Sequence, residues 1–250
     1  MFMSVFAREC EVPAYAELAG VRVLLTGVNS AVGVDVARSF ADHKARLVLQ
    51  TAENSPAMTE LAAVLSESAA ELRVYDGPFA GSDEAVCLVQ SVMQDMGGLD
   101  AVVNLVHIEP QDCARFESVD DVEGFIADRL EAAAMITRVA ANRMRLTWTE
   151  GAILNVVTMP SAGVRRAGLL ADITRVMLAD LTRAQAREWA EYGIRVNSVG
   201  PTSSVSALSS GAPLTSDADL AALALHLASR GGRKLTGHML DAEGLATRHC

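Results

Sequence analysis

A glycine loop near the start of the chain is the strongest local sign of chemistry. An apolar run ends at Thr26 and Gly27, and Gly33 follows where a helical pattern begins. Backbone N–H groups at such a strand-to-helix turn, with the positive end of the helix behind them, suit a phosphate group. Ala31 lies between the glycines, and its methyl group hinders the close approach of a pyrophosphate to the backbone of the loop. The loop therefore predicts a weakened nucleotide-phosphate site.

The four cysteines, by contrast, predict no metal or disulfide chemistry. They occupy positions 10, 87, 113 and 250, so none forms a CxxC pair. None clusters with histidine at the spacing of a metal site. We therefore expect no metal, and a reducing compartment such as the cytoplasm.

Composition and charge exclude several classes of partner. Acidic residues outnumber basic ones by 31 to 21, giving a net charge of −10. A chain this acidic is a poor candidate for nucleic-acid binding. It has no uncharged apolar stretch long enough to span a membrane, and its first residues do not follow a secretory signal pattern. The charge balance favours solubility but specifies no substrate.

The elements that must position the loop follow from the hydrophobic pattern. Expected strands are 21–26, 46–50, 72–75, 101–105, 152–157, 194–199 and 238–241, and expected helices are 31–42, 57–68, 82–96, 118–147, 166–192 and 217–230. Short apolar strands that alternate with helices predict an α/β fold, with a parallel sheet covered by helices on both faces. Residues 1–17 are expected to form an N-terminal extension, and residues 18–250 a single domain.

Five stretches, in order, resemble motifs of the short-chain dehydrogenase/reductase family over residues 18–244. They are TGVNSAVG from Thr26, LDAVVNLVH from Leu99, GAILNVVT from Gly151, YGIRVNSVGPT from Tyr192 and LTGHMLDAEG from Leu235. The resemblance implies a Rossmann-like, doubly wound sheet of about seven strands in a homodimer or homotetramer. It also implies hydride transfer between a nicotinamide cofactor and a carbonyl or alcohol carbon.

In that family a tyrosine exchanges the proton, assisted by a lysine four residues later, a serine and an asparagine. Matching the motifs places Thr158 at the serine and Ala171 at the tyrosine. Arg175 falls at the lysine and Arg129 at the asparagine. The resemblance therefore implies a catalytic tetrad in which all four residues are changed.

Ala171 is the most severe of these changes, because alanine has no proton to give. Losing a positioned general acid typically costs a factor of about 10²–10⁴ in rate. Arg175 keeps a positive charge but does not release a proton, whereas Thr158 keeps a hydroxyl group. The tyrosines of the chain, Tyr15, Tyr75 and Tyr192, all lie more than a helical turn from position 171 in the sequence.

The resemblance also implies a binding site for NAD or NADP. Thr51 stands where an acidic residue would hold the adenosine ribose of NAD. No arginine replaces it for the phosphate of NADP, although Lys44 and Arg46 are near in sequence. The sequence therefore specifies neither cofactor and leaves open whether either binds. The expected cofactor-binding residues are Gly27, Asn29, Ser30, Val32, Gly33, Thr51, Asn104, Pro201 and Thr202.

Two further features admit more than one interpretation. His107 stands where the family has a glycine beside the cofactor, so it either packs over an emptied pocket or replaces the proton donor. Arg129 and Arg175, with the pair Arg165 and Arg166, either converge on a small anionic ligand or pair with neighbouring acids.

The sequence supports three functional hypotheses. The first is a catalytically impaired or noncatalytic nucleotide- or anion-binding protein, or a subunit beside an active homologue. The second is an NAD(P)-dependent oxidoreductase acting on a carbonyl or alcohol substrate, with a non-standard proton donor such as His107 or a water held by Thr158. The third is a structural partner that binds no small molecule. An oligomer is expected to use the helices at 118–147 and 166–192.

Overall fold

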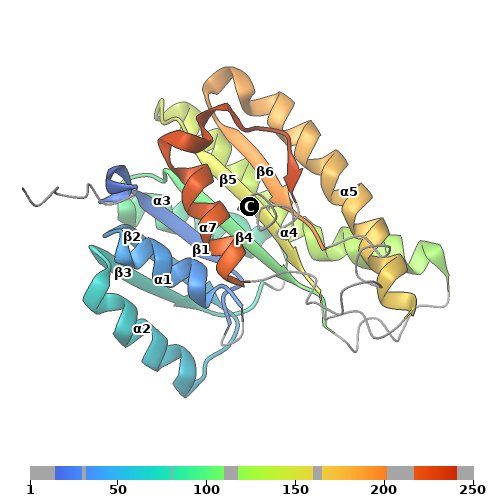
Figure 1. The fold of residues 1–250 in the computed structure, drawn as a ribbon, viewed down its shortest axis with the longest axis horizontal. Helices are drawn as coiled ribbons and strands as arrows, with labels where there is room; N and C mark the ends of the chain where they lie inside the picture. The colour runs from blue at the N-terminus through green and yellow to red at the C-terminus, as the bar shows by residue number, and fades with distance from the viewer. Residues whose placement is uncertain are drawn as a thin grey trace, which may run out of the picture.

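Seven parallel strands form one sheet in the order β3-β2-β1-β4-β5-β6-β7 (Figure 1). The computed structural model describes residues 15–29, 32–79, 81–109, 118–159, 165–201 and 217–240, without the side chains of 165–169 and 217. The strands are β1 (Arg22–Thr26), β2 (Arg46–Thr51), β3 (Glu71–Asp76), β4 (Ala101–His107), β5 (Ala152–Thr158), β6 (Arg195–Val199) and β7 (Met239–Leu240). The expected doubly wound α/β sheet is confirmed.

Helices cover both faces of this sheet. They are α1 (Val34–Asp42), α2 (Pro56–Ser68), α3 (Ser82–Met96), α4 (Val119–Leu146), α5 (Arg165–Trp189) and α7 (Asp217–Ala228). In Figure 1, α1, α2 and α7 lie in front of the sheet, and α3 and α4 lie behind it. Helix α5 packs against α4 on that second face. No helix among the described residues is long and apolar enough to cross a bilayer.

Several element boundaries differ from the sequence-based expectation. Helix α1 begins at Val34 rather than at 31, because Gly33 before it has a left-handed φ of +84°. Helix α5 ends at Trp189, and the next three residues form a 3-10 turn. Strands β4 and β5 run further than expected, since they continue to pair as far as His107 and Thr158.

Local capping explains where two of the helices begin. Ser118 accepts a hydrogen bond from the Asp121 N–H at 3.1 Å, and the Asp121 carboxylate accepts one from the Ser118 N–H at 3.0 Å. This reciprocal pair satisfies two backbone donors at the start of α4. Ser55 caps α2, whose first residue is Pro56. Proline suits this position because the N–H it lacks would have no partner in the helix.

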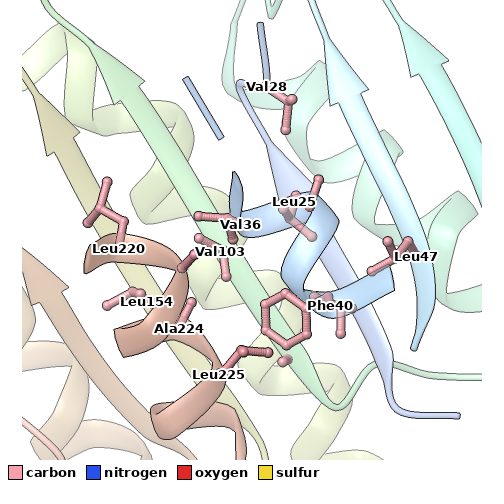
Figure 2. Packing of buried hydrophobic residues seen from close by; sticks show 14 of the residues in the cluster. Leu25, Val28, Val36, Phe40, Leu47, Val103, Leu154, Leu220, Ala224 and Leu225 are labelled. Carbon is pink, nitrogen blue, oxygen red and sulfur yellow. The ribbon is translucent and has the colours of Figure 1, made fainter. Parts of the chain in front are cut away.

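The core lies in two layers, one on each face of the sheet. Figure 2 shows the front layer, in which Phe40 of α1 packs between α7 and the strands. The rear layer joins α3, α4 and α5 to the other face and includes Trp189. A third cluster, near the carboxyl end of β5, contains Ile108, Val122, Ile126, Leu130, Val157, Met159, Leu170, Ala171 and Leu178.

Candidate nucleotide and proton-transfer site

The fold places the candidate residues at the carboxyl edge of the sheet. The strand order reverses between β1 and β4. In open α/β sheets, ligands bind in the crevice beyond the strand ends at such a reversal. Gly27 follows β1, while His107 ends β4 and Thr158 ends β5 in direct register with it. The motifs therefore meet at the edge of the sheet where this reversal lies.

Close packing against β4 explains why glycine is needed at both glycine positions of the loop. Gly27 has a φ of +73°, and a Cβ at this position would overlap the carbonyl oxygen of Leu105. Gly33 has a φ of +84°, and a Cβ there would overlap the Leu105 side chain. Any larger residue would push the loop away from the sheet. Both glycines are thus required by the fold, whether or not a ligand binds.

Hydrogen bonds within the chain already engage part of the loop's donor set. The Gly27 N–H donates to Gln50 Oε1 at 2.8 Å, and the Val32 N–H donates to Asn29 Oδ1 at 2.7 Å. The buried Gln50 amide is itself anchored, since its Nε2 donates to the Gly77 carbonyl oxygen at 2.7 Å. A phosphate at Val32 would have to displace the Asn29 side chain. Ser30 lies outside the described residues.

Gln50 is a residue of this site that the sequence analysis missed. It is 3% exposed at the end of an otherwise apolar strand. A buried amide must find partners, because leaving it unpaired is costly. The sequence therefore contained a signal for this residue, a polar side chain at the end of an apolar run. It did not show which groups that side chain would bond to.

Thr51 and Asn104 are buried and bonded within the protein. Thr51 Oγ1 accepts a hydrogen bond from the Glu53 N–H at 3.0 Å, which closes the turn after β2. Asn104 Nδ2 donates to Asn155 Oδ1 at 2.8 Å, and Asn104 Oδ1 accepts from Thr26 Oγ1 at 3.0 Å. Asn104 thereby ties β4 to both neighbouring strands.

The basic residues near β2 lie at the opposite end of the strand from the crevice. Arg46 begins β2 and forms an ion pair of 2.7 Å with Glu71 at the start of β3. Lys44 donates to the carbonyl oxygen of Ser68 at 2.7 Å, where α2 ends. Neither cation therefore lies at the end of β2, where a 2′-phosphate would need it.

His107 is bonded through both ring nitrogens. Its Nε2 lies 3.2 Å from the Gly27 carbonyl oxygen and its Nδ1 lies 2.6 Å from Thr158 Oγ1. A carbonyl oxygen only accepts, so Nε2 carries the proton in this contact. In the neutral ring, Nδ1 then accepts the hydroxyl proton of Thr158. The imidazole thus spans from the loop after β1 to the end of β5.

The residues expected at the tyrosine and lysine positions of the tetrad, Ala171 and Arg175, lie in different surroundings. Ala171 is 1% exposed and lies in the third apolar cluster. The guanidinium of Arg175 donates through Nη1 to the Pro201 carbonyl oxygen at 2.6 Å. Arg129 is on an exposed face of α4, with its guanidinium 5.1 Å from the Phe125 ring centroid. These contacts direct Arg129 and Arg175 to different partners.

All three tyrosines lie among the described residues, and each has its neighbours elsewhere. Tyr75 donates its phenol to Asp95 at 2.7 Å, and Tyr15 packs edge-on against His43. Tyr192 lies under the guanidinium of Arg145 beyond the end of α5. No phenol of this chain is therefore positioned at Thr158.

The remaining candidate residues complete the description of the site. Among the described residues, no group of three or more His, Cys, Asp or Glu side chains is arranged to hold a metal ion. Thr202 and Cys113 lie outside the described residues, as do the side chains of Arg165 and Arg166.

The His107 imidazole ring and a separate hollow lie at this edge of the sheet. The ring occupies the end of β4 and uses the Gly27 carbonyl and the Thr158 hydroxyl. A hollow of about 330 Å³ lies at the ends of β2 and β3 and is lined by Thr51, Glu53, Asn54, Ser55, Met58, Thr59, Ala62, Val74 and Asp76.

Comparison with known proteins extends over most of the chain. A family model described as enoyl-(acyl carrier protein) reductase matches residues 27–244. Gluconate 5-dehydrogenase of Gluconobacter oxydans is 24% identical over 76% of this chain and 73% of its own length. Galactitol 2-dehydrogenase of Cereibacter sphaeroides is 28% identical over 74% of this chain and 71% of its own.

Solved structures share the fold at lower sequence identity. An NADH-dependent reductase complexed with NAD superposes with a TM-score of 0.71 at 18% identity, covering 92% of this chain and 97% of that one. A short-chain dehydrogenase from Oenococcus oeni gives 0.70 at 20% identity, covering 91% and 97%. With the sheet order, the five motifs and the family match in agreement, the chain belongs to the short-chain dehydrogenase/reductase family.

Proposed function

We propose that this protein is a short-chain dehydrogenase/reductase homologue that lacks the proton-transfer pair of its family. Its role is that of a catalytically impaired nucleotide- or anion-binding protein, or a subunit beside an active homologue. The observation that carries this proposal is Ala171, a buried methyl group among apolar side chains where the family has a phenol.

The neighbours of Ala171 support the same conclusion. Arg175 keeps a positive charge, but its guanidinium is bonded to Pro201 and does not release a proton. The Thr158 hydroxyl faces the imidazole of His107. Among the described residues, no other proton donor takes the place of a tyrosine at position 171. Carbonyl reduction at ordinary enzyme rates is therefore not expected.

A steady-state assay tests this proposal. NADH and NADPH oxidation is followed with a panel of aldehydes and ketones. A typical enzyme turns over about 10 times per second, and losing a positioned acid removes a factor of about 10²–10⁴. We expect turnover below about 0.1 s⁻¹ for every substrate. Turnover in the ordinary range for any carbonyl would overturn the proposal.

A binding assay separates this role from that of a purely structural partner. A ligand held at about 100 times its Kd stabilises the folded state by about 2.7 kcal/mol. We expect an adenine nucleotide to raise the thermal midpoint by the corresponding amount. No shift with adenine nucleotides or inorganic phosphate would favour the structural role.

One contact favours a second candidate, an oxidoreductase with a non-standard proton donor. Thr158 Oγ1 and His107 Nδ1 lie 2.6 Å apart. When the ring is protonated, Nδ1 donates to Thr158 and leaves the hydroxyl proton free for a substrate oxygen. This candidate requires measurable turnover that increases towards acid pH. His107→Phe would remove that pH dependence, and Thr158→Val would abolish turnover.

We also propose a homodimer or homotetramer formed through α4 and α5. A hollow of about 510 Å³ on this face is lined partly by Met135, Arg138, Val139, Glu188 and Trp189. Trp189 Nε1 is buried there and has no hydrogen-bond partner among the described residues. Arg138 and Glu188 line this hollow with opposite charges, which would complement each other across a twofold axis between two copies of the chain. Light scattering should give a dimer or tetramer that Val139→Arg dissociates, and a monomeric wild type would contradict this.

A further inference from the structure

We propose that His107 divides the crevice, so that the nucleotide site accepts the adenosine diphosphate portion of a ligand and excludes the nicotinamide ring. This inference rests on the proposed nucleotide-binding function and specifies its ligand. The residue concerned is the histidine at the end of β4, which the proton-transfer machinery of the family does not use.

The position of the ring carries the first step of the argument. A doubly wound sheet binds a dinucleotide with one half on each side of the strand-order reversal. Here the reversal lies between β1 and β4. The His107 ring bridges it, because one nitrogen contacts Gly27 after β1 and the other contacts Thr158 on β5. The ring therefore lies over the half formed by β4 and β5.

The surroundings of the ring reinforce this exclusion. Val157 and Met159, on either side of Thr158 in the sequence, are buried with Ala171 in the third apolar cluster. Arg175 is held at the carbonyl oxygen of Pro201. For a nicotinamide ring to enter, His107 must leave, and both of its hydrogen bonds must break. The Gly27 carbonyl and the Thr158 hydroxyl would then depend on the incoming ligand for partners.

The other half of the crevice has room and suitable chemistry for adenosine. The hollow at the ends of β2 and β3 presents the carboxylates of Glu53 and Asp76 and the amide of Asn54. Carboxylates accept hydrogen bonds from ribose hydroxyl groups, and Met58 offers an apolar contact for the base. The same two carboxylates repel a 2′-phosphate. The ligand class is therefore an adenosine diphosphate without a 2′-phosphate.

Calorimetric titration of the full chain with ADP-ribose and NADH tests the inference. The two ligands share adenosine and diphosphate and differ in the nicotinamide ring. In the wild type we expect ADP-ribose to bind at least as tightly as NADH. In His107→Ala we expect NADH to gain at least about tenfold, while ADP-ribose changes less than about threefold. His107→Phe keeps the bulk of the ring and should behave like the wild type.

His238→Ala provides the matched control. This exposed histidine immediately precedes β7 at the far edge of the sheet, so its removal should alter neither affinity. If His107→Ala does not fold, the wild-type comparison and His107→Phe decide the question.

The outcomes separate this inference from the function on which it rests. NADH binding to the wild type at least about tenfold tighter than ADP-ribose would overturn the inference and leave nucleotide binding intact. Equal gains for NADH in His107→Ala and His107→Phe would also overturn it. If neither ligand binds any of the four proteins, the inference and the nucleotide-binding function are both wrong.

Discussion

At the scale of single residues, the site is defined by side chains that bond to one another. His107 forms hydrogen bonds with the Gly27 carbonyl oxygen and the Thr158 hydroxyl group, and the Asn29 side chain accepts one from the Val32 N–H. Groups that would hold a ligand in an open nucleotide site are here satisfied within the protein. A ligand must compete with these contacts, so affinity depends on how easily each side chain moves.

Gly27 offers a clean test of how closely the loop approaches β4. Gly27→Ala combines a left-handed φ with overlap against Leu105, whereas Gly20 has a similar φ of +78° and open space around it. Gly20→Ala should cost about 1–2 kcal/mol from backbone strain alone. We expect Gly27→Ala to cost about 1–3 kcal/mol more, as overpacking does. Urea unfolding measures both, and equal losses would contradict the close approach.

At the scale of elements, a buried polar network attaches α4 to the sheet. Asn104 on β4 bonds to Asn155 on β5 and to Thr137 on α4 at 3.3 Å. Thr137 donates in turn to Asn155 at 3.2 Å. The network therefore fixes the long helix over the strands whose ends form the crevice.

Removing the centre of this network should destabilise the fold. Asn104→Ala leaves the buried Asn155 carbonyl and Thr26 hydroxyl with fewer partners, and each unsatisfied group costs about 1–3 kcal/mol. We expect unfolding free energy to fall by at least about 2 kcal/mol in chemical denaturation. Asn142→Ala, which loses one partly exposed bond to Arg145, is the control and should stay within about 0.5 kcal/mol. Similar losses in the two variants would show that the network adds no stability.

The amino-terminal ends of β1 and β4 are joined by an ion pair with a pH signature. Asp100 accepts hydrogen bonds from the Arg22 N–H at 2.9 Å, Nε at 2.8 Å and Nη2 at 2.7 Å. Burial alone would raise the pKa of Asp100, but these bonds outweigh it and hold the pKa below its usual value. The stabilisation is therefore present above about pH 4 and is lost as pH falls through the lowered pKa.

Asp100→Asn should reveal that contribution. At pH 7 we expect a loss of about 1.5–3 kcal/mol, the range for hydrogen bonds to charged groups. The gap between variant and wild type should narrow as pH falls below about 4, because the wild-type carboxylate is then protonated. Asp35→Asn, whose exposed pair with Arg38 spans 3.7 Å, should change stability by less than about 1 kcal/mol. A pH-independent gap for Asp100→Asn would refute the ion-pair account.

At the scale of the whole molecule, the sheet joins two helical layers. Phe40 is fully buried in the front layer, and Trp189 is 6% exposed in the rear one. Because the same strands carry both layers, we expect the described regions to unfold together as a single domain. Phe40 and Trp189 lie on opposite faces of the sheet. A substitution at Phe40 can therefore perturb the front layer while the fluorescence of Trp189 reports on the rear layer.

Phe40→Ala should test that coupling. Large-to-small changes at buried phenylalanine cost about 3–5 kcal/mol. We expect the midpoint from tryptophan fluorescence to shift by the same amount as the midpoint from far-ultraviolet circular dichroism. Val64→Ala, at a side chain on α2 that is 49% exposed, is the control and should move neither midpoint. A shift in one signal alone would mean that the layers unfold separately.

The sequence by itself determined the fold class. The alternation of apolar strands and amphipathic helices shows which residues along the chain are buried. That pattern is enough to predict a parallel sheet with a layer of helices on each face. The identity of residue 171 is equally local, since alanine offers no proton in any structure, but its assignment to the tyrosine position of the family stays a prediction. Strand ends were less certain, because pairing extended β4 and β5 to His107 and Thr158.

Only the tertiary structure decided the partners of the polar side chains. Gly27 and His107 are 80 residues apart in sequence, and their contact exists because β1 and β4 are neighbours in the sheet. Gln50 accepts the hydrogen bond of the Gly27 N–H because the loop after β1 passes its side chain. Arg129 is exposed because its side chain points away from the sheet side of α4. A hydrophobic pattern shows which residues are buried, but a hydrogen bond also needs distance and angle, which only the folded chain supplies.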